Sequence, residues 1–543
     1  MREFARLYNE LDGTTATNRK LDALKRYFGA AAPANAAWAV YFLAGGKPRQ
    51  VVSTKLLRQF SIEMSDVPEW LFDECYLAVG DLAETISHIL PPPEYETNIG
   101  LAAWMEERIL PLRGETPEKI RAALFDYWRG LDTHTRFLLI KLISGGFRVG
   151  VSKLLVIRAL GELSGLDHKI ISQRMMGSVD GHALPTVESY QRLLATPAAL
   201  EQNTSQGGQP YPFFLSHPLQ SDPRKLGDIR LWHAEWKYDG IRAQLVQRAG
   251  HSYLWSRGEE LITDRFPEIG GISLPEGTVI DGEILIWKSD KPASFAALQR
   301  RIGRKKVSLK IMDELPAVFI AFDLLEHKGR DLRQTVQMER RAHLDAVASA
   351  VASPALMLSP LIEAPDWEAL ETLRAGSRAR GVEGVMLKSV HAQYGVGRTK
   401  EGGVWWKWKL DPYAVDAVLV YAQQGHGRRA SLYTDYTFAV WSNGPDKERK
   451  LVPFAKAYSG LTDREIAQVD GMVRKTTLEK FGPVRSVIPT MVFEIGFEGI
   501  SRSSRHKSGV AVRFPRMLRM RQDKKIDDAD TLDTLKAMLG NHE

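Results

Sequence analysis

Apolar positions recur at helical spacing in the first 200 residues of the chain. Phe4, Leu7 and Leu11 fall three or four residues apart, which places them on one face of a helix. Thr116-Pro117-Glu118, with proline at the first helical position, is a helix-start signal. The apolar positions that follow it also share one side: Ile120, Leu124, Tyr127 and Trp128. Similar patterns, separated by Gly-rich turns, continue to about residue 195 and predict an all-α domain.

The pattern changes at residues 196–229. The segment from Asn203 to Pro210 is polar and rich in turn-forming residues, which indicates a linker. Beyond it, short apolar or alternating stretches predict strands. These stretches are Leu245 to Trp255, Val279 to Trp287, Ala317 to Leu325 and Val385 to Lys388. A helical stretch from Gln334 to Ala352 interrupts them, so this part predicts an α+β domain that ends near residue 410.

A third region begins at Asp416. Short strands are expected from Asp416 to Tyr421, from Tyr436 to Trp441 and from Met491 to Ile495, a spacing typical of a small β-barrel. The chain therefore predicts three domains, with residues 1–200 helical, 201–410 mixed α and β, and 411–543 forming the barrel.

Composition narrows the class of protein only moderately. The 543 residues carry a formal net charge of +7, which favours a polyanionic partner such as nucleic acid, although many basic proteins bind none. The single cysteine, Cys75, excludes an intrachain disulfide and a zinc site with four cysteine ligands. The chain start has no apolar signal core, and no apolar run is long enough to cross a bilayer, so we expect a cytoplasmic protein that does not enter membranes.

The first candidate for chemistry is the segment from Glu235 to Arg242, which contains Lys237-Tyr238-Asp239-Gly240. A lysine between acidic groups, close to a glycine at a strand end, can lie at a phosphate-binding pocket and act as a nucleophile. Asp-Gly is also a common turn pair. A Lys-x-Asp-Gly string arises by chance in on the order of one chain in ten of this length, so the string alone is weak.

An ordered set of further elements follows Lys237. They are Ser256-Arg257-Gly258, Asp281-Gly282-Glu283, Phe322-Asp323, Glu383 to Lys388, Trp405-Trp406-Lys407-Trp408-Lys409 and Arg513-Phe514-Pro515-Arg516. Their order and spacing closely resemble the nucleotidyltransferase motifs of ATP-dependent DNA ligases, and the resemblance covers essentially the whole chain. It implies a multidomain protein with an all-α DNA-binding domain, an α+β nucleotidyltransferase domain (the ATP-grasp-like ligase core) and an OB-fold β-barrel.

The resemblance also implies a role for each matching residue. Lys237 would attack the α-phosphate of ATP and form lysyl-AMP. The residues implied to contact ATP or AMP are Glu235, Arg242, Arg257, Glu283, Phe322, Arg398, Lys407 and Lys409. Glu235 would contact the adenine, Phe322 would stack on it, and the two lysines would neutralise the α-phosphate. Without the motif, Phe322 would be assigned to core packing and the alternating lysines to a solvated strand face.

Two carboxylates and two arginines complete the implied site. Glu283 and Glu383 match residues that bind a divalent metal, Mg²⁺ or Mn²⁺. Arg513 and Arg516 match arginines that orient pyrophosphate or contact DNA, near the family's Arg-x-Asp-Lys pattern at residues 521–524. The stretch around Arg398 departs from the family, because extra residues separate it from Trp405. Lys400 is therefore a rival for its nucleotide contact.

The helical region indicates DNA as the partner. Gly145 to Val151 includes Arg148 and resembles the DNA-binding domain of archaeal and eukaryotic replicative ligases, where glycines beside an arginine let backbone amides approach phosphates. The segment from Val79 to Glu84 carries the same resemblance, and both segments could instead be helix-ending turns. NAD-dependent relatives carry a zinc module with four cysteines, so the single cysteine favours ATP.

The function implied is sealing of 5′-phosphate/3′-hydroxyl nicks in duplex DNA by a monomer, through lysyl-AMP and a DNA-adenylate, with release of pyrophosphate and AMP. An RNA ligase or an mRNA-capping guanylyltransferase uses the same lysine core but lacks such a helical domain. A non-catalytic DNA-binding scaffold is a third reading, which degraded motifs would favour. No catalytic position is lost from the sequence.

Overall fold

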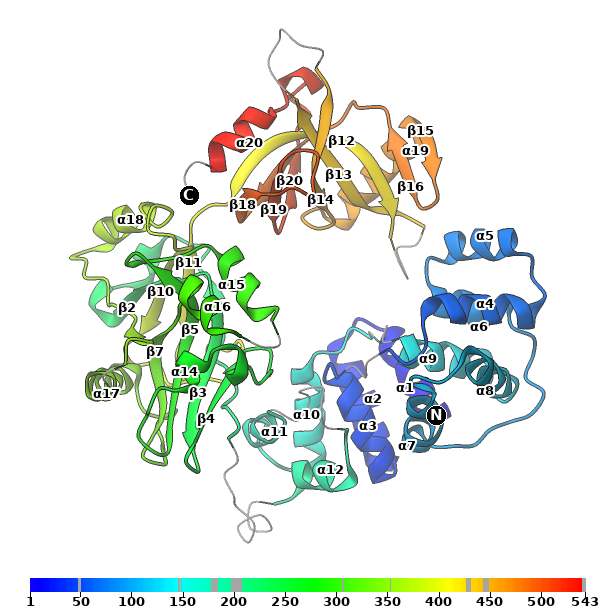
Figure 1. Cartoon of the computed structure of the whole chain (residues 1–543), viewed down its shortest axis with the longest axis horizontal. Helices are drawn as coiled ribbons and strands as arrows, with labels where there is room; N and C mark the ends of the chain where they lie inside the picture. Colours follow the sequence, from blue (N-terminus) through cyan, green and yellow to red (C-terminus); the bar gives the residue numbers. More distant parts are fainter. Residues whose placement is uncertain are drawn as a thin grey trace. The chain divides into compact units, whose positions relative to one another are not determined.

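The structure is a computed structural model in which the chain forms two compact units. The described residues are 1–46, 50–144, 147, 149–176, 184–196, 208–304, 307–351, 353–425, 431–442 and 449–539. One unit comprises Met1–Arg49, Asn98–Arg108 and Phe147–Leu410, and the other comprises Gln50–Thr97, Ile109–Gly146 and Asp411–Glu543. Figure 1 labels their elements.

The amino-terminal part of the first unit is helical. Its helices are α1 (Arg2–Asp12), α2 (Thr17–Ala30), α3 (Pro33–Leu43), α7 (Leu101–Ala103, continued by a π-helical turn), α10 (Lys153–Ser164), α11 (His168–Arg174) and α12 (Val187–Leu194). In α1, Phe4, Leu7 and Leu11 are all buried, which confirms the predicted apolar face. Phe4 stacks on Phe147 with ring centroids 5.8 Å apart, so residues distant in sequence form one aromatic core.

The helices of the second unit are amphipathic. They are α4 (Thr54–Ser65), α5 (Glu69–Val79), α6 (Leu82–Ile89), α8 (Pro117–Arg129) and α9 (Thr133–Ser144). Thr116 caps α8, because its side chain accepts a hydrogen bond from the N–H of Lys119 and Pro117 occupies the first turn. The predicted buried positions of α8 are confirmed: Ile120, Leu124, Tyr127 and Trp128.

Two sheets form the α+β part of the first unit. The smaller sheet has the order β1 (His217–Pro218), β11 (Trp405–Lys409), β10 (Gly384–Ser389) and β2 (Trp232–Trp236). The larger has the order β4 (His251–Ser256), β3 (Ile241–Arg248), β5 (Thr278–Lys288), β7 (Ala317–His327) and β8 (Arg330–Asp331), with β6 (Lys291–Pro292) paired to β5 and β9 (Leu356–Leu358) paired to β7. Apolar side chains from both sheets, such as Val246 and Trp405, share one core cluster.

Helices cover the outer faces of these sheets. They are α14 (Pro267–Gly270), α15 (Phe295–Ile302), α16 (Leu309–Glu314), α17 (Gln337–Ala350) and α18 (Trp367–Ala375). Leu344 and Val347 of α17 join the core of the larger sheet, and α17 lies beside β7 (Figure 1). Trp367 and Leu370 of α18 pack with Leu387 of the smaller sheet.

One predicted strand is wrong in its extent. The apolar run from Leu245 to Trp255 is a hairpin of two strands, because Ala249 and Gly250 turn the chain with φ of 51° and 75°. The predicted helix from Gln334 to Ala352 is α17, whose bounds are Gln337–Ala350. The other expected strands in this region are confirmed as parts of β5, β7 and β10.

The carboxy-terminal part of the second unit is a small barrel. Its main sheet has the order β14 (Leu451–Ala457), β13 (Tyr433–Trp441), β12 (Tyr413–Gln424), β16 (Val484–Val487) and β15 (Thr477–Phe481), and β17 (Val492–Phe497) joins β12 to β20 (Arg516–Met520). The remaining elements are β18 (Gly499–Arg502), β19 (Val510–Arg513), α19 (Asp463–Thr476) and α20 (Leu532–Leu539).

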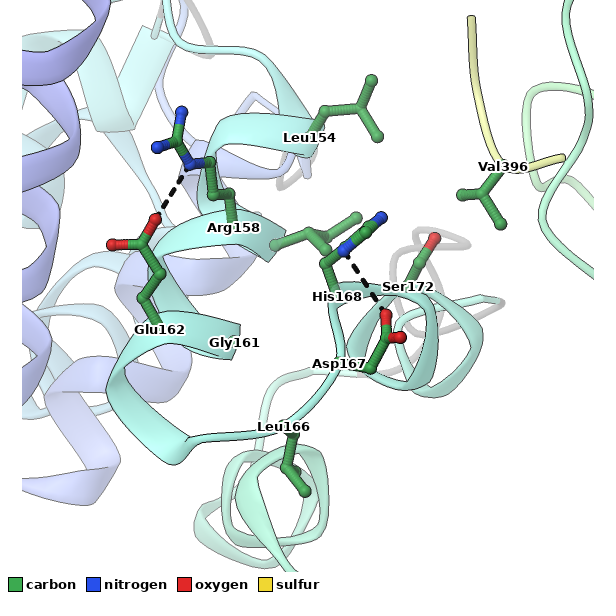
Figure 2. Close-up of a pocket in the computed structure, with 10 residues that line it drawn as sticks. Leu154, Arg158, Gly161, Glu162, Leu166, Asp167, His168, Ser172 and Val396 are labelled. Carbon is green, nitrogen blue, oxygen red and sulfur yellow. Dashed lines mark hydrogen bonds and ion pairs between the residues drawn. The ribbon is translucent and has the colours of Figure 1, made fainter. Parts of the chain in front are cut away.

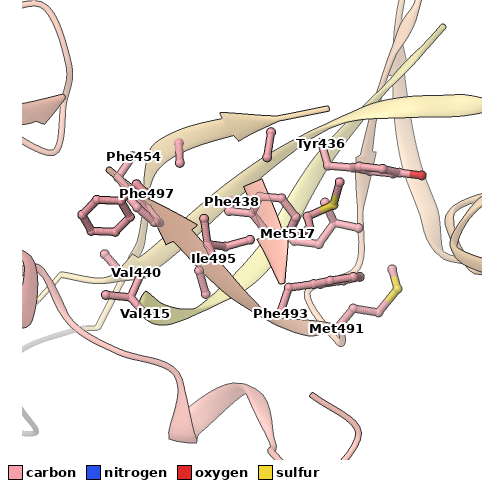
Figure 3. Packing of buried hydrophobic residues seen from close by; sticks show 14 of the residues in the cluster. Val415, Tyr436, Phe438, Val440, Phe454, Met491, Phe493, Ile495, Phe497 and Met517 are labelled. Carbon is pink, nitrogen blue, oxygen red and sulfur yellow. The ribbon is translucent and has the colours of Figure 1, made fainter. Parts of the chain in front are cut away.

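The larger of the two core clusters of the barrel is rich in aromatic side chains. Figure 3 shows Phe438 and Phe493 among its buried side chains, and their ring centroids lie 5.3 Å apart in an edge-to-face arrangement. The three strands expected from the sequence are confirmed as parts of β12, β13 and β17. The domain limits at residues 200 and 410 stay a prediction. Among the described residues, none of the helices has both the length and the apolar character that crossing a membrane requires.

Candidate active site

Lys237 directly follows strand β2 of the smaller sheet. Its backbone N–H donates to the carbonyl of Gly384 at 2.9 Å, and its carbonyl accepts from the N–H of Glu383 at 2.8 Å. The side chains also meet, since Nζ of Lys237 lies 2.5 Å from Oε2 of Glu383. Gly384 has φ of 141°, and a Cβ there would lie 2.4 Å from the carbonyl oxygen of Trp408. Glycine thus lets β10 approach β11 and places Glu383 beside the lysine.

Lys407 and Lys409 alternate with tryptophans on β11, as expected for side chains on one strand face. Nζ of Lys409 lies 3.1 Å from the same Glu383 oxygen that contacts Lys237. Burial lowers the pKa of Lys407, and the charges of Lys237, Lys409 and Arg398 lower it further. Three lysines therefore converge on one region with a single carboxylate between two of them, an arrangement suited to a polyphosphate.

Arg398 and its rival Lys400 occupy different surroundings. Arg398 acts on the pKa of Lys407, so its charge lies near the lysine cluster. Nζ of Lys400 lies 5.1 Å from the ring centroid of Trp406, the residue that alternates with Lys407 on β11. This placement favours Arg398 over Lys400 as the residue near a bound phosphate.

The side chain of Arg242 is held by several hydrogen bonds. Its guanidinium makes a two-point contact with Asp281, at 3.1 and 2.7 Å, and donates to the carbonyl of Phe214 at 2.6 Å. Asp281 is fully buried and also accepts a hydrogen bond from the hydroxyl of Tyr394 at 2.5 Å. Burial is the largest single influence on the pKa of Arg242 and lowers it, but the charges of Asp281, Tyr394 and Glu283 and the hydrogen bonds to Asp281 together raise it by more, so the net shift is upward. Arg242 braces the pocket wall, and its contact with a nucleotide stays a prediction.

Glu283 faces Arg242 across the pairing of β3 with β5. Burial raises the pKa of Glu283 from its ordinary value of 4.5 to about 7, against the opposing charges of Lys237, Arg242 and Arg257. Glu383 behaves differently: burial raises its pKa, but Lys237 and Lys409 lower it by more, so the net shift is downward. Two carboxyl groups near one lysine therefore have separated pKa values, a feature common in catalytic sites.

Lys388, to which no role was assigned from the sequence, contacts both Glu235 and Phe322. Lys388 is 1% exposed, donates to Oε1 of Glu235 at 2.7 Å and to the carbonyl of Phe322 at 3.0 Å, and lies 4.4 Å from the centre of the Phe322 ring. Burial lowers the pKa of Lys388, while Glu235 raises it. A lysine in an otherwise apolar strand was the sequence signal for this buried pair.

Four residues predicted for the site remain: Arg257, Arg148, Arg513 and Arg516. Arg257 is exposed after β4, and its charge reaches Glu283. Arg148 lies outside the described residues. Arg513 lies over the ring of Phe514, 5.1 Å from its centroid, and Arg516 pairs with Glu498 at 3.0 Å. Both belong to the second unit.

Arg521 and Lys524 of the barrel share a carboxylate. Nη1 of Arg521 contacts both oxygens of Asp416, at 3.0 and 3.1 Å, and Nζ of Lys524 lies 2.6 Å from one of them. Both residues belong to the Arg-x-Asp-Lys pattern, although the pyrophosphate or DNA contacts were predicted for Arg513 and Arg516. The structure shows a second basic cluster at this pattern.

A cavity of about 540 Å³ lies at α10 and α11, apart from the predicted site residues. Leu154, Ile157, Leu166 and Val396 contribute apolar surface to it. Figure 2 shows its charged side chains already paired with each other, Arg158 with Glu162 at 2.9 Å and Asp167 with His168 at 3.3 Å. The cavity therefore lacks the surplus of cations that surrounds Lys237.

The arrangement around Lys237 suits transfer of a nucleotide to an amine. It combines an amine nucleophile, cations for a phosphate, and buried polar groups beside an aromatic ring for a base. No cluster of three or more potential metal-binding His, Cys, Asp or Glu side chains is found in the described part of the chain.

Comparison with known proteins places the whole chain in one family. Three family models match it: DNA ligase N terminus at residues 1–161, ATP dependent DNA ligase domain at 217–409 and ATP dependent DNA ligase C terminal region at 429–524. A probable DNA ligase of Koribacter versatilis is 30% identical over 98% of this chain and 95% of its own length. A DNA ligase of Methanoculleus marisnigri is 29% identical over 80% of this chain and 76% of its own.

A solved structure agrees in fold. Pmar-Lig_PreS3 superposes with a TM-score of 0.60 at 15% identity, over 95% of this chain and 99% of that one. Fold and matches together define a covalent nucleotidyltransferase with a nucleotidyltransferase domain and an OB-fold-type carboxy-terminal domain. The chain belongs to the ATP-dependent DNA ligase family, whose members use ATP and a divalent metal to seal nicks in DNA.

Proposed function

We propose that this chain seals 5′-phosphate/3′-hydroxyl nicks in duplex DNA by way of an AMP group carried on Lys237. The observation that supports Lys237 is its contact with Glu383 at 2.5 Å, on a carboxylate that Lys409 shares. A lysine held at one point among further cations is placed to meet the α-phosphate of ATP. The later steps are transfer of AMP to the 5′-phosphate and attack by the 3′-hydroxyl, which releases AMP.

The first step is a substitution at phosphorus. Nζ of Lys237, as a neutral amine, forms a bond to the α-phosphorus while the bond to the bridging oxygen of the β-phosphate breaks. Pyrophosphate leaves with the electron pair of that bond. The proton lost from Nζ has the carboxylate of Glu383 as its nearest acceptor. Lys407 and Lys409 stabilise the charge on the α-phosphate oxygens, with Arg398 at the edge of the cluster.

The base and ribose contacts follow the placement of the remaining residues. Phe322 would stack on the adenine, since its ring is only partly buried beside Lys388, and Glu235 would contact the edge of the base. Glu283, with a pKa of about 7, would accept from a ribose hydroxyl, while Arg257 is the exposed cation near it. Arg242 would act at the ribose side of the pocket from its pair with Asp281.

Glu283 and Glu383 would hold the divalent metal, for which Mg²⁺ is our first choice and Mn²⁺ the second. Their carboxylate oxygens are the hard ligands that both ions accept, and charges from Lys237 reach both groups. When bound, the metal supplies positive charge to the phosphates.

Duplex DNA would be held mainly through its backbone. Arg513 and Arg516 are proposed to contact pyrophosphate or DNA, and Arg148 to contact DNA from the helical region. Such contacts neutralise phosphates, do not depend on sequence and weaken with salt, which suits an enzyme for nicks in any sequence. We propose that the enzyme acts as a monomer on the nucleoid.

The proposal is tested without DNA first. The protein is incubated with Mg²⁺ and ATP labelled on the α-phosphate, and label that stays on the denatured protein is measured in parallel with γ-labelled ATP. We expect label from the α-phosphate only, and none with Lys237→Ala. Labelling by GTP in place of ATP would instead indicate capping chemistry. A duplex with a single nick then tests joining, and an RNA nick tests the RNA-ligase alternative.

A further inference from the structure

A layer of buried polar groups lies beneath Glu235, between α17 and β2. Gln337 and Arg341 are one helical turn apart on α17, and they are 0% and 7% exposed. His233 and Glu235 are two residues apart on β2, so they share a strand face. Nη1 of Arg341 lies 3.8 Å from Oε1 of Glu235, which brings the two elements together at this point.

One polar atom of this layer bears on Glu235 and has no hydrogen-bond partner among the described residues. It is Nη1 of Arg341, whereas the side chains of His233 and Gln337 lie within hydrogen-bonding reach of each other. A buried guanidinium with an unused N–H is costly, so its presence needs a reason. Nε of Arg341 donates to Oδ1 of Asp345 at 2.7 Å, and this bond directs the unused nitrogen toward Glu235.

Glu235 is held on one side only. Both nearby cations face its Oε1: Lys388 at 2.7 Å and Arg341 at 3.8 Å. Oε2 accepts no hydrogen bond from any residue that the structure describes. Lys388 also contacts the carbonyl and the ring of Phe322, the residue proposed to stack on the base. The remaining oxygen of Glu235, Oε2, therefore belongs to a side chain close to the proposed base site. A carboxylate oxygen can accept hydrogen bonds but cannot donate them.

We propose that Arg341 is a positioning residue for selection of the base. It holds Oε1 together with Lys388, so that Oε2 is presented as an acceptor to the 6-amino group of adenine. A 6-oxopurine offers a carbonyl oxygen at that position, and two acceptors repel. The inference rests on the proposed function, in which Lys237 is adenylylated and Glu235 contacts the base.

The test compares ATP with ITP, which carries a 6-oxo group. Single-turnover formation of the labelled protein adduct is measured with each α-labelled nucleotide for the wild type, Arg341→Gln and Arg341→Lys. For Arg341→Gln we expect the KM for ATP to rise about tenfold with a nearly unchanged maximal rate, and the ATP/ITP preference to fall about tenfold. Arg341→Lys, which keeps the charge, should restore most of the preference.

Arg301→Gln is the matched control, because Arg301 is also a buried arginine, and it pairs with Glu268. It should lower the melting temperature without changing the ATP/ITP preference. Equal loss with both nucleotides in Arg341→Gln, or an equal loss of preference in the control, would overturn the role of Arg341. If Arg341→Gln does not fold, Arg341→Lys alone decides, since it must still show a smaller preference than the wild type. A wild type that forms no adduct with either nucleotide overturns the proposed function itself.

Discussion

Ion pairs near the proposed nucleotide pocket are buried, whereas the pairs of two barrel arginines are exposed. Arg340 and Asp323 are both 0% exposed and form a two-point contact at 2.8 Å, and Arg242 with Asp281 is nearly as buried. In the barrel, the side chain of Arg519 is 62% exposed in its pair with Glu494, and that of Arg516 is 37% exposed. Buried pairs are committed to one arrangement, while exposed pairs are weak enough to exchange a carboxylate for a phosphate.

The difference separates two tasks. A pocket for one small nucleotide benefits from side chains fixed before it binds. A surface for DNA of any sequence benefits from cations that can be shared or released.

Breaking a buried pair should cost far more stability than breaking an exposed one. Arg340→Met leaves Asp323 charged and alone in the core, which should lower the free energy of unfolding by about 3–5 kcal/mol. Arg519→Met in the barrel should change it by about 0–1 kcal/mol. Urea denaturation of both variants measures this. Similar losses in the two would contradict the contrast.

Replacing the carboxylate of Glu383, which contacts Lys237, should impair adenylylation more than folding. Glu383→Gln removes the charge that Lys237 and Lys409 share. We expect the single-turnover rate of adduct formation to fall by about 10²–10³-fold, as for loss of one preorganised electrostatic contact. The melting temperature monitors folding, and a rate within threefold of the wild type would show that Glu383 has no part in the step.

Adenylylation should depend on pH through Glu283. Its pKa of about 7 means that the carboxylate forms only as the pH rises through 7. At subsaturating ATP the rate should therefore rise about tenfold per unit below pH 7 and level off above it. Glu283→Gln should lower the rate and flatten this limb. An unchanged profile in the variant would assign the limb to another group.

The same shift predicts an opposite trend in stability. Because the folded-state pKa of Glu283 lies above its ordinary value of 4.5, the protonated folded form is favoured. The stability that this group contributes is complete below about pH 4.5 and is lost as the pH rises through about 7. Comparing the pH dependence of unfolding in the wild type and in Glu283→Gln measures this difference.

The smallest effect is expected from single barrel arginines. Arg516→Ala should lower affinity for nicked duplex at every sequence by a similar factor and reduce the salt slope of binding by about one. Arg516→Lys retains the charge and should keep the slope. Titrations at several salt concentrations measure it, and a sequence-dependent loss would mean that Arg516 contacts bases.

The sequence predicted the elements better than the pairing inside the pocket. Helical periodicity was sufficient for α8 because its apolar positions all face one core. The run from Leu245 to Trp255 misled, since its apolar residues continue on both sides of a turn that depends on φ at Ala249 and Gly250. Arg242 was expected at the nucleotide, yet its donors face Asp281 and Phe214, a choice made by tertiary packing.

Burial also explains what the sequence did not indicate. No role was assigned to Lys388 from the sequence, because its contact with Glu235 depends on the pairing of β10 with β2. Arg341 was likewise assigned no role, since its burial depends on the packing of α17. Lys407 and Lys409 were correctly expected on one face, because alternation along a strand is local.

The most direct test of the account is to locate the adduct. The wild-type protein is incubated with ATP and Mg²⁺, digested with a protease, and the peptide that gains the mass of one AMP is sequenced by mass spectrometry. The account predicts AMP on Lys237 alone, lost on addition of pyrophosphate or nicked duplex DNA. AMP on another residue, or on none, would contradict it.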